Sequence, residues 1–244
     1  MDHIRIIQET DTAHAAICLT VGVLLYSLHQ SHEQKPAALY WAAISVVVGA
    51  MPVFLARLMT GSVLSVDFRF LLAISGNTIQ ILCYYLGVRS IDPSFKIDSS
   101  QLRTFLSFMA IPFALLIAAT GTPPTEGPWA TVLQLPVLTK MILGFLILAA
   151  GWKAQMEFFK AASKDSVAST SSKKRAVLWG VISGAPPMTC IFVSELVVPE
   201  PLLPAFWAIG LYIYLLAARI VDVLVLFDLY SVKSAPSVSK RVTR

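Results

Sequence analysis

Residues 37–58 read AALYWAAISVVVGAMPVFLARL, and the first twenty of them carry no charged side chain. An α-helix needs about 20 mostly apolar residues to cross the hydrocarbon core of a bilayer. The apolar residues here are continuous and do not alternate with polar ones, which favours a helix over a strand of a membrane barrel. The segment therefore predicts a transmembrane helix.

Six further segments have the same character on either side of this one. They are residues 12–28, 66–88, 102–120, 129–150, 176–198 and 203–227. Proline-rich breaks at 121–124 and 199–201 separate two of the pairs. Because lipid offers no partner to an unpaired backbone group, each segment has to be helical. We expect an all-α integral membrane bundle of seven transmembrane helices over residues 1–227, followed by a short basic cytoplasmic tail at 228–244.

The composition supports a membrane protein. Of the 244 residues, 56% are hydrophobic and only 14% are charged, whereas soluble domains carry about 25% charged residues. The mean hydropathy is +0.71. The hydrophobic core of a water-soluble domain could not bury so much apolar surface. We therefore expect the lipid bilayer to be the main partner of the chain.

The distribution of lysine and arginine predicts the orientation, since cytoplasmic loops are enriched in both. With the C-terminus inside, most of the 19 basic residues fall on cytoplasmic segments. These are Lys35, Arg89, Lys96, Arg103, Lys153, Lys160, Lys164, Lys173, Lys174, Arg175, Lys233, Lys240, Arg241 and Arg244. Only Arg5, Arg57 and Arg69 fall outside. The N-terminus is thus expected outside, in a bacterial inner (plasma) membrane. This asymmetry explains the net charge of +5 without nucleic acid.

The longest connection is expected between the fifth and sixth helices, at residues 151–175. Its centre, 163–172, is rich in Ser, Ala and Lys. Such a composition predicts a flexible loop.

Charged side chains inside the predicted helices are the first candidates for function, because they are costly in a bilayer. Lys140 lies near the centre of the fifth segment, where insertion of a lysine costs roughly 2.5–3.5 kcal/mol. It would pair or face a cavity, unless the helix is shifted outward and Lys140 lies near a surface. Arg219 and Asp222 are three residues apart on the seventh segment and can pair. They would act in gating, or simply ease insertion as an ion pair.

Three further positions are ligand-binding or gating candidates. Asn77 and Gln80 share one face of the third segment, and such amides either join helices or contact a ligand. Glu195 lies near the outer end of the sixth segment, where with Asp67 and Arg69 it would line an outward pocket. Glu195, Asp67 and Arg69 can equally be ordinary residues of the membrane–water interface.

Several chemistries find no support in the sequence. The four histidines cluster at 3–32, the three cysteines are isolated, and no H-E-x-x-H or G-x-S-x-G motif occurs. No lysine lies at the centre of the seventh segment, which argues against a retinal Schiff base. We therefore expect no catalytic residue, no metal and no cofactor.

Part of the chain resembles a known class of membrane region. The residues are LYWAA at 39–43, LLAISGN at 71–77 and ILCYYLGVR at 81–89. They are similar to the membrane-embedded seven-helix sensor regions at the N-termini of some bacterial diguanylate cyclases. Those proteins continue into a cytoplasmic cyclase domain with a GGDEF motif, which this chain lacks up to Arg244. The resemblance implies a sensor without its own output domain, and carries no catalytic residue over.

Three functional hypotheses follow. The first is a stand-alone sensory or signalling membrane protein that passes its state to a cytoplasmic or membrane protein partner, with an unknown ligand. The second is a transporter or channel for a small solute, with Asn77, Gln80, Lys140, Arg219 and Asp222 along the path. The third is a membrane enzyme or an accessory subunit of a membrane complex.

Overall fold

The computed structural model describes residues 3–60, 66–96, 98–100, 103, 137–166, 170–175, 178–179 and 203–230. Its long helices are α1 (His3–Ser31), α2 (Ala37–Thr60), α3 (Val66–Ile91), α6 (Val137–Asp165) and α8 (Leu203–Tyr230). No strand occurs among these residues, so the all-α prediction is confirmed for the described part of the chain. The predicted helices at 102–120 and 176–198 lie almost wholly outside the described residues.

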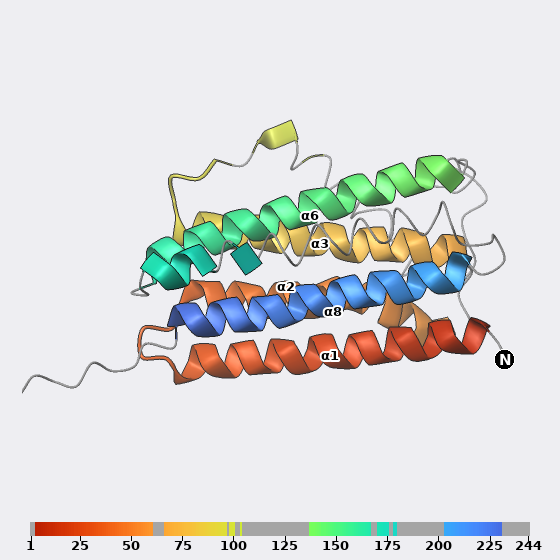
Figure 1. The fold of residues 1–244 in the computed structure, drawn as a ribbon, viewed down its shortest axis with the longest axis horizontal. Helices are drawn as coiled ribbons and strands as arrows, with labels where there is room; N and C mark the ends of the chain where they lie inside the picture. The colour runs from red at the N-terminus through yellow and green to blue at the C-terminus, as the bar shows by residue number, and fades with distance from the viewer. Residues whose placement is uncertain are drawn as a thin grey trace, which may run out of the picture.

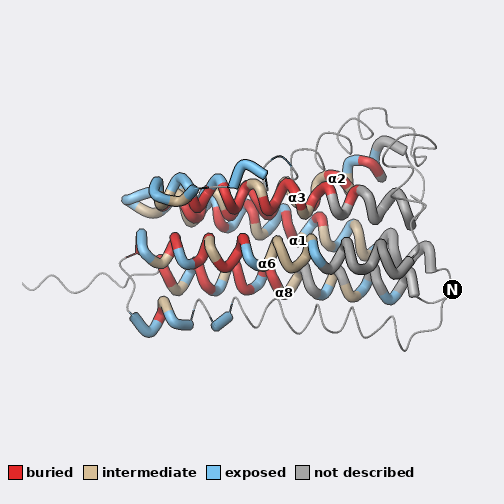
Figure 2. The backbone as a smooth tube through the Cα atoms, turned by 90° about the horizontal axis from the view of Figure 1, so that it is seen from above, coloured by how far each residue is buried: buried red, intermediate tan, exposed pale blue. Residues whose placement is uncertain are grey.

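The long helices lie side by side as one bundle (Figure 1). α2 packs between α1 and α3, and α6 packs on the other side of α3. α8 packs mainly on α1 and also contacts α2 and α6, which closes the bundle. The described core contains large side chains such as Leu25, Tyr84, Phe158, Phe159 and Leu226, and Figure 2 marks the buried positions along the helices in red.

Four of the helices run in the same direction. α1, α3, α6 and α8 all end at one end of the bundle, where α2 begins (Figure 1). Contacts fix the register: His14 lies against Tyr212, and His32 contacts Tyr230, a constant separation of 198 residues between α1 and α8. Between α3 and α6 the separation is 70 residues at Asn77 and 72 at Asp92.

Glycine permits the closest approach in the bundle. A Cβ atom on Gly76 of α3 would overlap the backbone carbonyl of Gly49 on α2. A Cβ on Gly49 would in turn lie 3.0 Å from the side-chain amide of Gln80. Small residues let membrane helices pack backbone to backbone in this way.

The distribution of polarity is the reverse of that in a soluble bundle. On α8 the exposed large side chains form one helical stripe: Phe206, Ile209, Ile213, Ile220, Leu224 and Phe227. Polar side chains are buried instead, among them Ser45, Gln80, Gln155, Arg219 and Asp222. Within the described residues, Glu9–Ser31 and Ala37–Ala56 are long and apolar enough to cross a membrane.

The predicted C-terminal end of α6 was wrong. A loop was expected from residue 151, but the helix continues to Asp165. Ala154, Phe158, Ala161 and Ala162 recur at helical spacing and are buried, so packing against α3 stabilises the extension despite its lysines. Lys140 lies three residues after Val137, where α6 begins in the described part of the chain, and residues 129–136 of the predicted segment are outside that part. The α3–α6 register places the backbone of Lys140 beside residues 68–70, near the start of α3.

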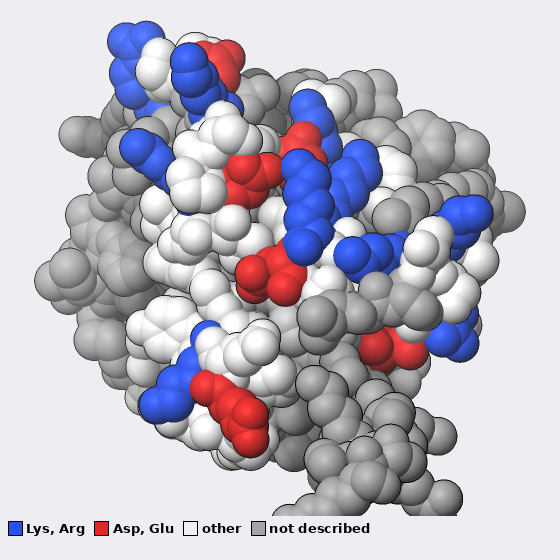
Figure 3. Space-filling model, turned by 90° about the vertical axis from the view of Figure 1, so that its left-hand side faces the viewer, with Lys and Arg blue, Asp and Glu red and all other residues white. Residues whose placement is uncertain are grey.

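The end at which α1, α3, α6 and α8 finish is called here the basic end. Lysines and arginines gather on it, as Figure 3 shows. Lys164 of α6 pairs with Asp92 after α3 at 3.0 Å, and Arg175 pairs with Asp228 of α8 at 3.3 Å. The Ser94 hydroxyl donates to the Asp92 carboxylate and is the main reason that the pKa of Asp92 is lowered.

Candidate functional site

An ion pair lies inside the bundle, on the inner face of α8. Arg219 Nη1 is 2.9 Å from Asp222 Oδ2, and the two side chains are 4% and 0% exposed. The separation of three residues puts both on one face of the helix. The pairing predicted for these residues is therefore present, and it is buried.

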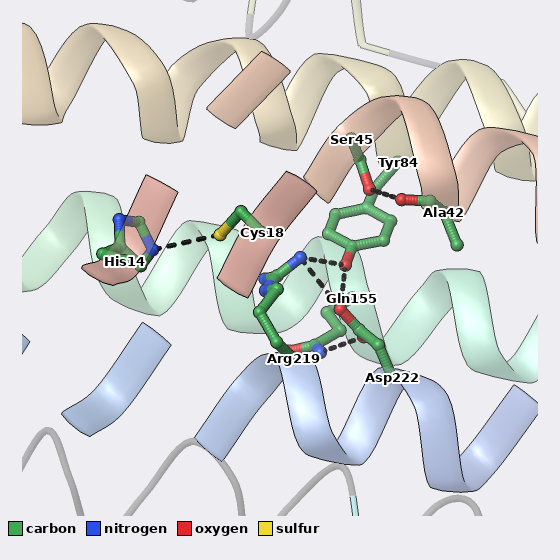
Figure 4. A network of polar contacts seen from close by, with 8 residues as sticks. All are labelled: His14, Cys18, Ala42, Ser45, Tyr84, Gln155, Arg219 and Asp222. Carbon is green, nitrogen blue, oxygen red and sulfur yellow. Dashed lines mark hydrogen bonds and ion pairs between the residues drawn. The ribbon is translucent and has the colours of Figure 1, made fainter. Parts of the chain in front are cut away.

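Side chains from α3 and α6 complete the bonding of the carboxylate (Figure 4). The Tyr84 hydroxyl donates to Asp222 Oδ2 at 2.9 Å. Gln155 Nε2 donates to the other oxygen, Oδ1, at 2.6 Å. Both carboxylate oxygens thus have partners from neighbouring helices, as a buried charge requires.

The guanidinium is held in a similar way. Arg219 Nη1 lies 3.4 Å from the Tyr84 hydroxyl oxygen. The Gln80 amide, with its oxygen turned toward Arg219, accepts from both Nη atoms. Gln80, Tyr84, Gln155, Arg219 and Asp222 are called here the polar core. It joins α3, α6 and α8 and carries no net charge.

Residues of α1 and α2 border the polar core. Cys18 of α1 is buried near Arg219, and its Sγ lies 3.2 Å from His14 Nε2 (Figure 4). The His14 ring also meets the edge of Tyr212 on α8. Ser45 of α2 is buried beside Tyr84 and donates to the Ala42 carbonyl. All five long helices therefore contribute polar atoms at this level.

The polar core lies nearer to the basic end than to the other end. Asp222 is eight residues from Tyr230, the last residue of α8, which is about 12 Å along the helix. It is 19 residues from Leu203, or about 28 Å. A charge network at this depth is protected from water by the core residues beyond it, such as Leu226 and Leu229.

This arrangement is suited to fixing helices relative to one another. Removing one partner of a buried ion pair leaves the other charge uncompensated, at a cost of about 3–5 kcal/mol. Any displacement of α8 has to break or exchange these contacts together. Because it holds α8 against α3 and α6, the polar core is also called the latch below.

The predicted site residues are only partly brought together. Gln80, Arg219 and Asp222 meet in the polar core. Asn77 lies outside it and donates to the Ile147 carbonyl of α6 at 3.3 Å, which favours its interpretation as a residue that joins two helices. The side chains of Lys140, Asp67 and Arg69, and all of Glu195, are outside the described residues.

Two members of the polar core were not predicted. Tyr84 follows Gln80 by four residues, so the shared face of α3 was a usable signal. Gln155 falls in the segment expected to be a loop. The spacing of Ala154, Phe158 and Ala162 would have revealed a helix there and placed Gln155 next to its buried face.

The described residues contain no group of three His, Cys, Asp or Glu side chains that could hold a metal ion. No family model matches the sequence, and no curated protein or solved structure shows significant similarity to it.

Proposed function

We propose that this chain is an integral membrane protein that senses a signal and transmits it to a partner by a shift of α8. The observation that carries the proposal is the buried polar core. It ties α8 to α3 and α6 through charged contacts that form or break as a set.

Two observations support insertion in a bilayer. Large apolar side chains cover the outside of α8 and α1, while the ion pair is buried. A row of aromatic rings, Tyr26, His29, Tyr40 and Trp41, crosses α1 and α2 near the basic end. Such rows are typical of the boundary between hydrocarbon and headgroups.

The directions of the helices support seven crossings with the basic end in the cytoplasm. α3 ends at the basic end, whereas α6 and α8 both start at the opposite end (Figure 1). One further crossing before α6 and one before α8, as the sequence predicts at 102–120 and 176–198, would join these ends. Together with α1, α2, α3, α6 and α8 they would give seven.

The polar core would then lie within the membrane. The 28 residues of α8 span about 42 Å, and the hydrocarbon core is about 30 Å thick. Centred on α8, that core leaves about 6 Å at each end, so Asp222 is about 6 Å inside its cytoplasmic boundary. Low dielectric strengthens the latch there.

Contacts at the basic end offer a route for the readout. The Tyr230 hydroxyl donates to the Ala162 carbonyl of α6, and the Tyr230 carbonyl contacts His32 after α1. A shift of α8 would change both contacts and the Arg175–Asp228 pair. The signal must bind the two arrangements with different affinity to move the equilibrium.

The test uses a photo-cross-linking amino acid at Lys174, on the basic end, in cells. Tyr84→Phe weakens the latch without creating a large space, and Ile213→Ala on the exposed face of α8 is the control. We expect a protein adduct whose yield changes at least twofold in Tyr84→Phe and not in Ile213→Ala. An adduct of equal yield in all variants would indicate an accessory subunit. No adduct, together with solute uptake that depends on Asp222 in proteoliposomes, would indicate a transporter.

A further inference from the structure

Charged residues line the outer face of α6 unusually far from the basic end. Lys153, Glu157, Lys160 and Lys164 recur at spacings of four, three and four residues, which places them on one face of the helix. The three lysines are exposed and Glu157 is half-buried. This set is called here the lysine stripe.

The stripe reaches the level of the polar core. The α3–α6 register puts Lys153 beside residues 81–83, or 8–10 residues before Ile91, the end of α3. That is about 12–15 Å from the basic end. At a similar level α8 presents Ile220 and Leu224, each 50% exposed, as a lipid-facing surface would.

The members of the stripe differ in their partners. Lys164 is paired with Asp92 at 3.0 Å. Glu157 lies close enough to Tyr85 of α3 to interact electrostatically. Lys153 and Lys160, seven residues or about 10 Å apart along the axis, remain on the exposed side. Long flexible stems let both ammonium groups converge on one anion between them.

An exposed leucine continues the stripe away from the basic end. Leu146, 58% exposed, is seven residues before Lys153 and therefore on the same face. The face thus offers an apolar side chain followed by two cations. This order matches an anionic phospholipid of the cytoplasmic leaflet, with its chains toward Leu146 and its phosphate toward Lys153 and Lys160.

We propose that the lysine stripe binds one anionic phospholipid in preference to neutral ones. A lysine at the depth of Lys153 is costly in hydrocarbon. A lipid phosphate beside it would neutralise the ammonium charge and bring water of hydration to it. The inference rests on the proposed membrane insertion. Attraction of anionic lipid is worth about 1 kcal/mol per lysine, which is about fivefold in affinity.

The experiment compares lipid adducts of the purified full chain by native mass spectrometry. The probes are phosphatidylglycerol and phosphatidylcholine with identical acyl chains. We expect one preferentially retained phosphatidylglycerol on the wild type, and about 10- to 30-fold weaker retention in Lys153→Gln/Lys160→Gln. Lys173→Gln/Lys174→Gln removes the same charge elsewhere on the basic end and should weaken it less than threefold.

Each other outcome overturns the proposal. Equal retention of the two lipids, or equal loss in the two double variants, would mean that no specific site exists. Displacement of the lipid by millimolar inorganic phosphate would assign the site to free phosphate, and a co-purified acidic protein in place of lipid would assign it to a protein partner. Extraction of the chain from membranes by alkaline carbonate without detergent would contradict membrane insertion itself, and so separates the two failures.

Discussion

Tyr84 and Arg219 meet at a single atom: the tyrosine hydroxyl and the guanidinium both lie 2.9 Å from Asp222 Oδ2. One carboxylate oxygen thus links α3 to the ion pair of α8. The tyrosine is a neutral partner of that pair, and it is the residue whose removal disturbs the latch with the least change in packing.

Tyr84→Phe should lower the free energy of unfolding by about 1.5–3 kcal/mol, since the lost hydrogen bond has a charged acceptor. Asn77→Ala removes an uncharged bond to the Ile147 carbonyl and should cost about 0.6 kcal/mol, the usual value between membrane helices. Reversible unfolding in mixed micelles measures both. A larger loss of unfolding free energy in Asn77→Ala than in Tyr84→Phe would show that the Asn77 bond contributes more to helix packing than the Tyr84 bond of the polar core.

Asp222→Leu alone should destabilise the bundle by about 3–5 kcal/mol, because Arg219 stays buried and charged. Adding Arg219→Met removes that charge and should recover more than half of the loss. The same unfolding measurement applies. If the double variant is as unstable as Asp222→Leu, the ion pair contributes through packing and not through its charges.

Gly76→Ala should cost about 1–3 kcal/mol, as overpacking typically does. The new Cβ meets the backbone of Gly49, which cannot move without shifting α2. Gly22→Ala is the matched control, because its Cβ overlaps a methyl group of the Val47 side chain and lies at an ordinary contact distance, 3.4 Å, from the Ala43 carbonyl oxygen. Equal costs at the two glycines would show that α2 and α3 can separate freely.

Acid should break the Asp92 contacts below the ordinary carboxyl pKa of 3.8. The pKa of Asp92 is lowered in the fold, so its contribution to stability is complete above pH 3.8 and is lost as the pH falls through the lower, folded value. Ser94→Ala and Lys164→Gln should each raise this pKa, because both side chains lower it by hydrogen bonding and Lys164 also lowers it by its charge. NMR titration of the Asp92 carboxyl carbon checks both shifts, and an unchanged pKa in either variant would show that its contact is absent in solution.

Single cysteines test the orientation in a background with Cys18, Cys83 and Cys190 replaced by serine. Glu9→Cys, near the start of α1, should react with a membrane-impermeant maleimide on intact cells. Glu33→Cys, in the turn before α2, should react only after the membrane is opened. Labelling of Glu33→Cys on intact cells would reverse the proposed topology.

The helices were predictable where hydropathy alone determines them. The expected segments 37–58, 66–88 and 203–227 correspond to α2, α3 and α8, each of which ends two or three residues later. The second half of α6, residues 151–165, was not predictable in this way, because Lys153, Lys160 and Lys164 lower its hydropathy while Phe158 and Phe159 lie in the core on the same turns.

The polar core was predictable only within one helix. The spacing of Arg219 and Asp222 gives their contact, since both lie on α8. The contacts of Asp222 with Tyr84 and Gln155 depend on how three helices pack, and these residues are separated by 138 and 67 positions in the chain. Local periodicity contains no information at that distance.

The constant offset between α1 and α8 has a consequence for biogenesis. These two neighbours are 198 residues apart, and ribosomes add about 5–20 residues per second. α1 is therefore made at least about 10 seconds before α8. If the chain inserts in a membrane as proposed, Cys18 and His14 would lack α8 during that interval, and α8 would bring Arg219 and Asp222 already able to neutralise each other. Insertion chaperones would have their longest task on the earliest helix, and a ribosome stalled before residue 203 would leave an open bundle for quality-control proteases.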